Sequence, residues 1–188
     1  MSTKLKVLWA PWRLRYIEQA RRFQACIFCE KAKEKRDFEN FILQRGKTSF
    51  TIMNLYPYAN GHLMVAPYKH SSEFDDLTDV ESLELLRSVS QSMKLLKQSL
   101  KPDGFNVGLN LGKVAGAGVE NHIHFHIVPR WLGDSNFMPV LADVKIIPEH
   151  IETTFRKLKR ELQKQVKLTT VKSNKSRKTI APRKQKSN

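Results

Sequence analysis

The sequence predicts an α+β domain: a five-stranded antiparallel sheet with a long central helix and a C-terminal helix. Five short segments have strand-like apolar patterns and are joined by turn residues, and the longest helical pattern lies mid-chain. Strands joined by short connections pair as hairpins, which favours an antiparallel sheet. With 188 residues, the chain suits a single domain with a substantial core.

Three strands are expected in the first half of the chain. They span Phe41–Gln44, Ser49–Asn54 and His62–Ala66. Arg45-Gly46-Lys47 suits a hairpin turn between the first two, and Tyr56–Gly61 forms a longer connection to the third. Pro67 ends the third strand because proline cannot donate a ladder hydrogen bond.

The long helix is expected over Asp79–Leu100, where apolar residues recur at three- and four-residue spacing. Thr78 and Glu81 form a capping box at its start, and Pro102 follows its end. Two further strands follow, at Phe105–Leu111 and His122–Val128. The C-terminal helix is expected to begin near Pro148.

Positive charge is concentrated at the C-terminus. The net charge is +15, and eight Lys and Arg follow from Lys167 onward with no acidic residue among them. We therefore expect one domain with an N-terminal arm over 1–166, and a basic, disordered tail over 167–188 that binds polyanions non-specifically. No apolar run is long enough to cross a membrane and no secretory signal is recognisable, so the expected location is the cytoplasm.

The run His122-Ile123-His124-Phe125-His126-Ile127-Val128 is the most distinctive of the chain. Its alternation predicts a strand with three histidines on one face, spaced about 7 Å apart in a row. Three interpretations stay open: a solvent-facing strand edge, a metal site, or nucleotidyl transfer in which one imidazole attacks phosphorus. The strict recurrence of histidine argues against the first.

The loop before the histidines favours nucleotidyl transfer. Gly112, Gly116 and Gly118 allow backbone N–H groups to approach an anion closely, as phosphate-binding loops require. An ordinary hairpin connection also contains glycine. The loop therefore indicates phosphate binding only because the histidines follow it.

His-x-His-x-His-x-x, with apolar residues at each x, is the motif of the histidine triad (HIT) superfamily, and His122–Val128 satisfies it in full. Asn60–Pro67 with Lys69-His70 resembles the strand and P-x-x-H element of that superfamily. Leu8–Arg13 and Pro129–Phe137 resemble its bacterial diadenosine tetraphosphate phosphorylase branch. The resemblance covers most of the chain before the tail, and it implies the HIT-like fold and a homodimer.

The resemblance implies an enzyme that works through a histidine–AMP intermediate. His124 would attack the α-phosphorus, His126 would stabilise phosphate charge or hold protons, and His62 would lie beside them. The implied reaction is phosphorolysis of diadenosine tetraphosphate to ADP and ATP, with inorganic phosphate as co-substrate and no cofactor required for the chemistry. A HIT-family hydrolase of dinucleoside polyphosphates or AMP conjugates is the alternative, and a nucleic-acid-associated nucleotide-binding protein is a further one.

The resemblance also implies nucleotide contacts. Asn54 matches a position that contacts the ribose and Asn110 one near the phosphates, although each asparagine would also suit a turn or strand-edge hydrogen bond. The expected nucleotide-binding residues are Asn54, Asn110, Gly116, Gly118, His124 and His126. The small hydroxyl residue that the family places before the triad has no counterpart here, so backbone amides would take over its role.

Cys26 and Cys29 have the C-x-x-C spacing of half a tetrahedral zinc site. In HIT proteins with such a pair, the remaining ligands map to His70 and His122, and the zinc would be structural. The alternative is a pair of buried free thiols.

Overall fold

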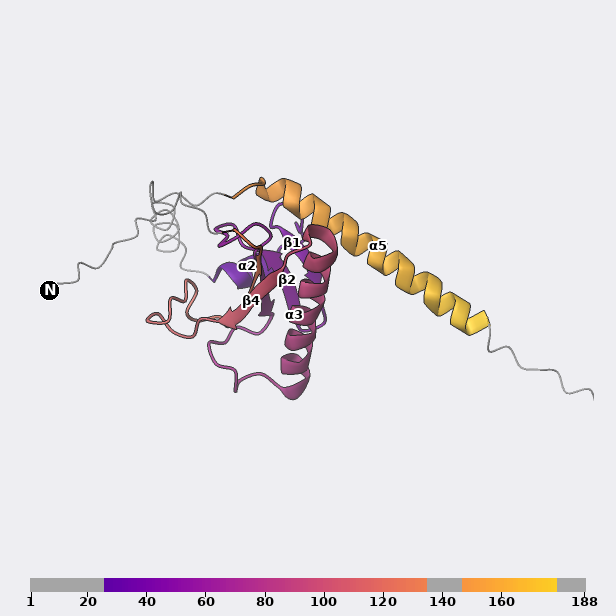
Figure 1. Cartoon of the computed structure of the whole chain (residues 1–188). Coiled ribbons are helices and arrows are strands. Elements are labelled where there is room, and N and C mark those ends of the chain that lie inside the picture. The colour runs from indigo at the N-terminus through magenta and orange to yellow at the C-terminus, as the bar shows by residue number, and fades with distance from the viewer. Residues whose placement is uncertain (1–25, 135–146, 179–188) are drawn as a thin grey trace, which may run out of the picture.

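The computed structural model describes residues 26–134 and 147–178 (Figure 1). Its strands are β1 (Ile42–Arg45), β2 (Ser49–Met53), β3 (Leu63–Pro67), β4 (Gly104–Leu109) and β5 (Phe125–Arg130). They form one sheet in the order β1-β2-β3-β5-β4, with every neighbouring pair antiparallel. The predicted fold class is confirmed. β5 begins at Phe125, however, and not at His122 as the alternation predicted.

The described helices are α2 (Ile27–Lys33), α3 (Asp79–Leu100) and α5 (Ile151–Lys178). α3 has the predicted bounds and the predicted capping box: the Thr78 hydroxyl accepts from the Glu81 N–H, and the Glu81 carboxylate accepts from the Thr78 N–H. No helix within residues 26–134 and 147–178 has the length and apolar character to cross a membrane. The N-terminal arm lies outside the described residues.

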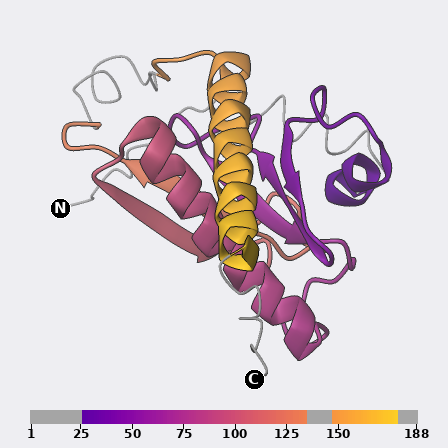
Figure 2. The ribbon, with the colours of Figure 1, turned by 90° about the vertical axis from the view of Figure 1, so that its right-hand side faces the viewer.

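α5 continues past the expected domain boundary. Its N-terminal part docks through Phe155 and Leu158, which are fully buried, and the helix then projects from the body as a rod (Figure 1). Figure 2 looks onto the side from which the helix projects. Residues 167–178 are helical, where the sequence predicted a disordered tail, since neither Gly nor Pro interrupts the chain there. The remainder of the tail is not described, so the boundary after residue 166 and the binding of polyanions stay predictions.

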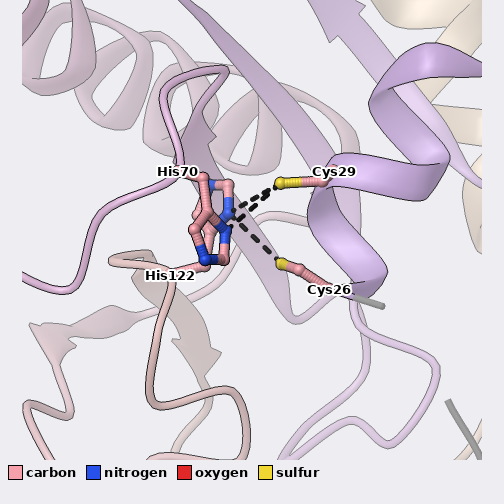
Figure 3. A group of neighbouring side chains, drawn as sticks. All are labelled: Cys26, Cys29, His70 and His122. Carbon is pink, nitrogen blue, oxygen red and sulfur yellow. Dashed lines mark hydrogen bonds between the residues drawn. The ribbon is translucent and has the colours of Figure 1, made fainter. Parts of the chain in front are cut away.

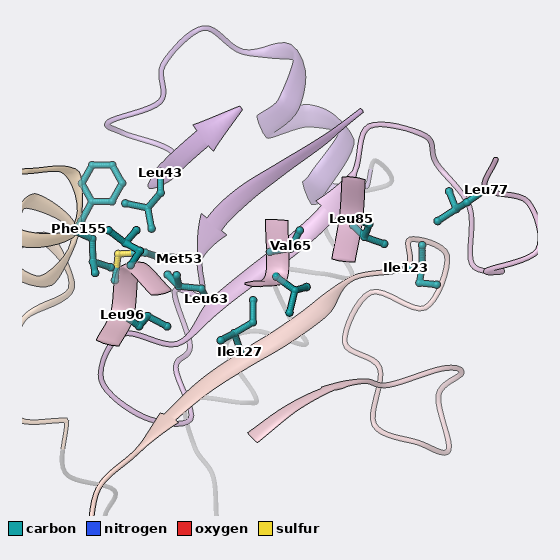
Figure 4. Packing of buried hydrophobic residues seen from close by; sticks show 13 residues of the cluster. Leu43, Met53, Leu63, Val65, Leu77, Leu85, Leu96, Ile123, Ile127 and Phe155 are labelled. Carbon is teal, nitrogen blue, oxygen red and sulfur yellow. The ribbon is translucent and has the colours of Figure 1, made fainter. Parts of the chain in front are cut away.

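The sheet separates two hydrophobic cores. The first lies under α3 and α5 and includes Leu63, Val65, Leu85, Leu96, Ile127, Phe155 and Leu158 (Figure 4). The second, on the opposite face, consists of Phe28, Ile42, Phe50, Ile52 and Ala66. Alternation along β3 explains the division, because Leu63 and Val65 face one core while Ala66 faces the other. α2 therefore packs on the face opposite α3.

Gly61 allows the end of α3 to approach the turn that leads into His62. Its φ is +75°, and a Cβ at this position would lie 2.5 Å from Leu100 Cδ1. Only glycine meets both requirements at low cost. The packing of α3 and the position of His62 are thus linked.

Candidate active site and metal site

His62, His124 and His126 meet beside the β3–β5 pair. His62 immediately precedes β3, and β5 places His126 opposite Met64 of β3. The ring centroids of His124 and His126 lie 4.8 Å apart, and those of His62 and His126 lie 5.2 Å apart. The predicted row of three evenly spaced histidines is therefore wrong. Because the strand begins only at Phe125, the rings of His124 and His126 contact each other, whereas His122 faces the cysteines.

Hydrogen bonds fix the proton positions on His62 and His126. The Tyr58 backbone N–H donates to His62 Nδ1 over 3.1 Å, and the Asn54 amide donates to the same nitrogen over 3.3 Å. Because His62 Nδ1 accepts, the neutral ring carries its proton on Nε2, which donates to His126 Nδ1 over 3.0 Å. The neutral His126 ring in turn carries its own proton on Nε2 and can donate it to a substrate.

His124 has the opposite tautomer. Its Nδ1 lies 2.8 Å from the backbone carbonyl oxygen of His122. A carbonyl oxygen can only accept, so Nδ1 carries the proton and the neutral ring keeps its lone pair on Nε2. An available lone pair on Nε2 is what a nucleophilic imidazole requires. His124 therefore offers a nucleophilic nitrogen, and the neighbouring His126 offers an N–H donor.

Burial keeps these imidazoles neutral. It lowers the pKa of His126 to about 4, with a smaller contribution from the neighbouring His124. Burial also lowers the pKa of His124, against the opposing effect of its hydrogen bond to the His122 carbonyl. Both shifts run downward from the usual value near 6.5. Near pH 7 His124 and His126 are therefore present as the neutral tautomers described above.

A second cluster consists of Cys26, Cys29, His70 and His122 (Figure 3). Cys26 Sγ lies 3.3 Å from His122 Nδ1, and Cys29 Sγ lies 3.3 Å from His70 Nδ1 and 3.5 Å from His122 Nδ1. A tetrahedral ion bound by sulfur and nitrogen separates these atoms by about 3.6 Å. The four ligand atoms lie within 4.8 Å of one another, so the group could hold a metal ion.

The state of His122 also suits metal binding. Its Nε2 lies 2.9 Å from the Pro67 carbonyl oxygen and must donate to it, which leaves the lone pair on Nδ1, facing the cysteines. Burial lowers the pKa of His122 to about 4, so the ring is neutral. Burial, with Cys26 beside it, raises the pKa of the Cys29 thiol to about 11. A bound cation would reverse that shift and hold thiolates.

The predicted nucleotide-binding residues have different surroundings. Asn54 bonds to His62 and, through its side-chain oxygen, to the Tyr56 N–H over 2.9 Å. Asn110 directly follows β4, at the position that continues the β4–β5 register opposite His124. Gly116 has a φ of +90°, and its N–H donates to Lys113 O within the loop. Their contacts with a nucleotide stay predictions.

The sequence patterns did not indicate two further residues of the site. Tyr58 stacks on His62, with ring centroids 4.9 Å apart and planes 22° apart. Phe28 packs on His124, with ring centroids 4.7 Å apart. No periodic pattern singles out Tyr58 within its connecting segment. Phe28 could have been considered, because it is an aromatic residue between the two cysteines of the C-x-x-C pair.

Comparison with known proteins points to the same family as the histidine motif His122–Val128. A model of the HIT domain matches residues 35–131. The chain is 41% identical over 170 residues to the AP-4-A phosphorylase of Mycobacterium tuberculosis (strain H37Rv), covering 86% of this chain and 87% of that protein. It is 34% identical over 106 residues to an adenosine 5'-monophosphoramidase of Saccharomyces cerevisiae, covering 56% of this chain and 63% of that protein.

A solved structure shows the same fold. The crystal structure of a zinc-bound histidine triad family protein from Mycobacterium smegmatis matches with a TM-score of 0.61 at 23% identity, over 77% of this chain and 97% of that one. The segment that the HIT model matches contains His62, His70, His122, His124 and His126, whereas Cys26 and Cys29 precede it.

Proposed function

This chain belongs to the HIT domain family of enzymes, and we propose that it is a phosphorylase that cleaves diadenosine tetraphosphate into ADP and ATP. The pair of opposite tautomers carries the proposal: His124 presents a lone pair on Nε2 and His126 presents an N–H. Similarity to an AP-4-A phosphorylase over most of both chains supports this choice of substrate.

In the first step, His124 Nε2 forms a bond to the α-phosphorus of the substrate. The bond from that phosphorus to the bridging oxygen breaks, and ATP leaves with the bonding electrons. The His126 N–H donates to the phosphate oxygens, on which negative charge increases. His62, held by the Tyr58 N–H, fixes the orientation of His126 by donating to its Nδ1.

In the second step, an oxygen of inorganic phosphate attacks the phosphorus of the His124–AMP intermediate. The bond between Nε2 and phosphorus breaks, ADP forms, and the free imidazole returns. Attack by water would instead release AMP. The same histidines would serve both acceptors, so the acceptor is selected by which molecule the active site admits.

The first test compares products with and without inorganic phosphate. We expect ADP and ATP in equal amounts. The rate should rise with the phosphate concentration and should be very low without phosphate. Chromatographic separation of the nucleotides after a short incubation measures this directly. Formation of AMP and ATP at a rate independent of phosphate would identify a hydrolase and overturn the phosphorylase proposal.

For the cysteine–histidine cluster we propose a structural zinc ion. Two thiols and two imidazole Nδ1 atoms form a common donor set of structural zinc, and all four positions are filled by the protein. Such an ion has no open position for substrate or water. The ion would not contact the substrate in the reaction proposed for His124.

We also propose that the enzyme is a homodimer joined along β4. This strand is at the edge of the sheet, and Asn106, Val107 and Gly108 are exposed on it. It contains neither proline nor a charged residue, the usual protections of a free edge. At the opposite edge, β1 buries Ile42 and Leu43.

Replacing Val107 with lysine should therefore convert the dimer to a monomer, because a charge on each edge would face its copy across the junction. Light scattering coupled to size-exclusion chromatography gives the mass. Val166→Lys on α5 is the matched control, since Val166 is also exposed but lies far along the chain from β4. A wild-type protein that is already monomeric at micromolar concentration would refute the proposal.

A further inference from the structure

Phe28 stands between the metal cluster and the proposed nucleophile. It lies between the two cysteines in sequence, its side chain is 2% exposed, and its ring centroid lies 5.1 Å from that of His122 and 4.7 Å from that of His124. We propose that Phe28 is a positioning residue through which an ion in the cluster holds the His124 ring in its reactive orientation. The inference rests on the proposed role of His124.

The first step concerns how α2 is held. The helix has seven residues, too few to be stable alone, and Phe28 is its one buried residue. Its C-terminal end is fixed by Arg45, whose guanidinium donates to Ala32 O over 2.6 Å and to Glu34 O over 2.7 Å. Its N-terminal end begins at Cys26, which makes no side-chain capping bond. Ligation of Cys26 and Cys29 would therefore fix the end that carries Phe28.

The second step concerns what orients His124. One edge of the ring is fixed by the bond from Nδ1–H to the His122 carbonyl oxygen, and one side is packed by Phe28. His126 contacts it with ring planes at 68°. Two of these three constraints come from His122, a ligand of the cluster, and from Phe28, which lies between two ligands. The same residues, His122 and Phe28, therefore connect the cluster to the His124 ring.

The consequence is a dependence of catalysis on an ion that never touches the substrate. If the N-terminal end of α2 is released, Phe28 leaves the second core and the His124 ring gains freedom to rotate. A displacement of about 1 Å at a reacting group costs on the order of 100-fold in rate. Most of the predicted nucleotide contacts are made by residues other than His124, so the loss should appear mainly in kcat, with little change in KM.

The test uses Phe28→Leu, which preserves most of the apolar volume, and Phe28→Met as a second variant. Phe155→Leu is the matched control, because Phe155 is equally buried but packs on Phe38 and Phe41 in the other core. For each protein we measure bound zinc, thermal unfolding, kcat and KM. We also record the nitrogen NMR signals of His124, which distinguish its two tautomers.

We expect all of these variants to bind zinc and to lose comparable stability. Only the Phe28 variants should lower kcat, by roughly 10- to 100-fold, and only they should weaken the Nδ1–H tautomer signature of His124. Removal of zinc from the wild type should produce the same change in the His124 signals. Wild-type kcat together with unchanged His124 signals in both Phe28 variants would overturn the inference. A wild type that does not cleave diadenosine tetraphosphate would refute the proposed function instead, and the NMR comparison would still decide the positioning role.

Discussion

His124→Ala should reduce kcat for diadenosine tetraphosphate by on the order of 10⁴-fold or more, as expected when a covalent nucleophile is removed. His124 is the imidazole of the pair whose lone pair is on Nε2, because its Nδ1–H is bound to the His122 carbonyl. Water or phosphate would then have to attack the substrate directly, without a histidine–AMP intermediate. Initial-rate measurements over a range of substrate concentrations check this expectation.

The control for that variant is His150→Ala. His150 is an exposed histidine just before α5, and it lies outside both clusters. Its kcat should stay within about twofold of the wild type, as for an ordinary surface substitution. His126→Ala should lie between the two, with a loss of about 10²- to 10³-fold typical of one donor to a developing oxyanion. Retained turnover in a folded His124→Ala protein would eliminate it as the nucleophile.

Cys29→Ser should produce the largest loss of stability. The change removes the sulfur that lies 3.3 Å from His70 Nδ1 and 3.5 Å from His122 Nδ1, and the remaining ligands would bind zinc far more weakly. We expect loss of bound zinc and a decrease in Tm of roughly 10 °C, since the binding energy of a structural ion contributes directly to folding. Differential scanning calorimetry and elemental analysis of protein purified without added metal provide the measurements.

A chelator serves as the internal control for that variant. It should lower the Tm of the wild type to nearly that of Cys29→Ser, and it should leave the Tm of Cys29→Ser itself unchanged. If the wild type purifies without zinc and Cys29→Ser unfolds at the same temperature as the wild type, Cys26 and Cys29 are ordinary thiols and the zinc proposal fails.

Local patterns were sufficient to predict most of the fold. The capping box at Thr78 and the apolar spacing after it gave both ends of α3, because these signals involve residues a few positions apart. α5 was different: the lysines after Val166 read as a disordered tail, yet residues 167–178 are helical. High charge alone does not end a helix when neither Gly nor Pro interrupts the chain.

The sequence predicted which side chains lie close together in the candidate site but not how they are arranged, and their roles stay predictions. The three alternating histidines were identified as a functional group, but strand periodicity could not show that β5 begins at Phe125. It could not show that His122 turns toward Cys26 either, a contact between residues far apart in sequence. The tautomers depend on the Tyr58 N–H and on the carbonyl oxygens of Pro67 and His122, and backbone groups leave no mark in a sequence.

The most direct test of the histidine–AMP mechanism is to trap the intermediate. The wild type is mixed with diadenosine tetraphosphate in the absence of phosphate, quenched at alkaline pH, and analysed by peptide mass spectrometry. We predict one adenylyl group on the peptide that contains His124, absent in His124→Ala and discharged as ADP when phosphate is added before the quench. Adenylylation of a different residue, or continued turnover with no adenylylated peptide at any time, would contradict the mechanism.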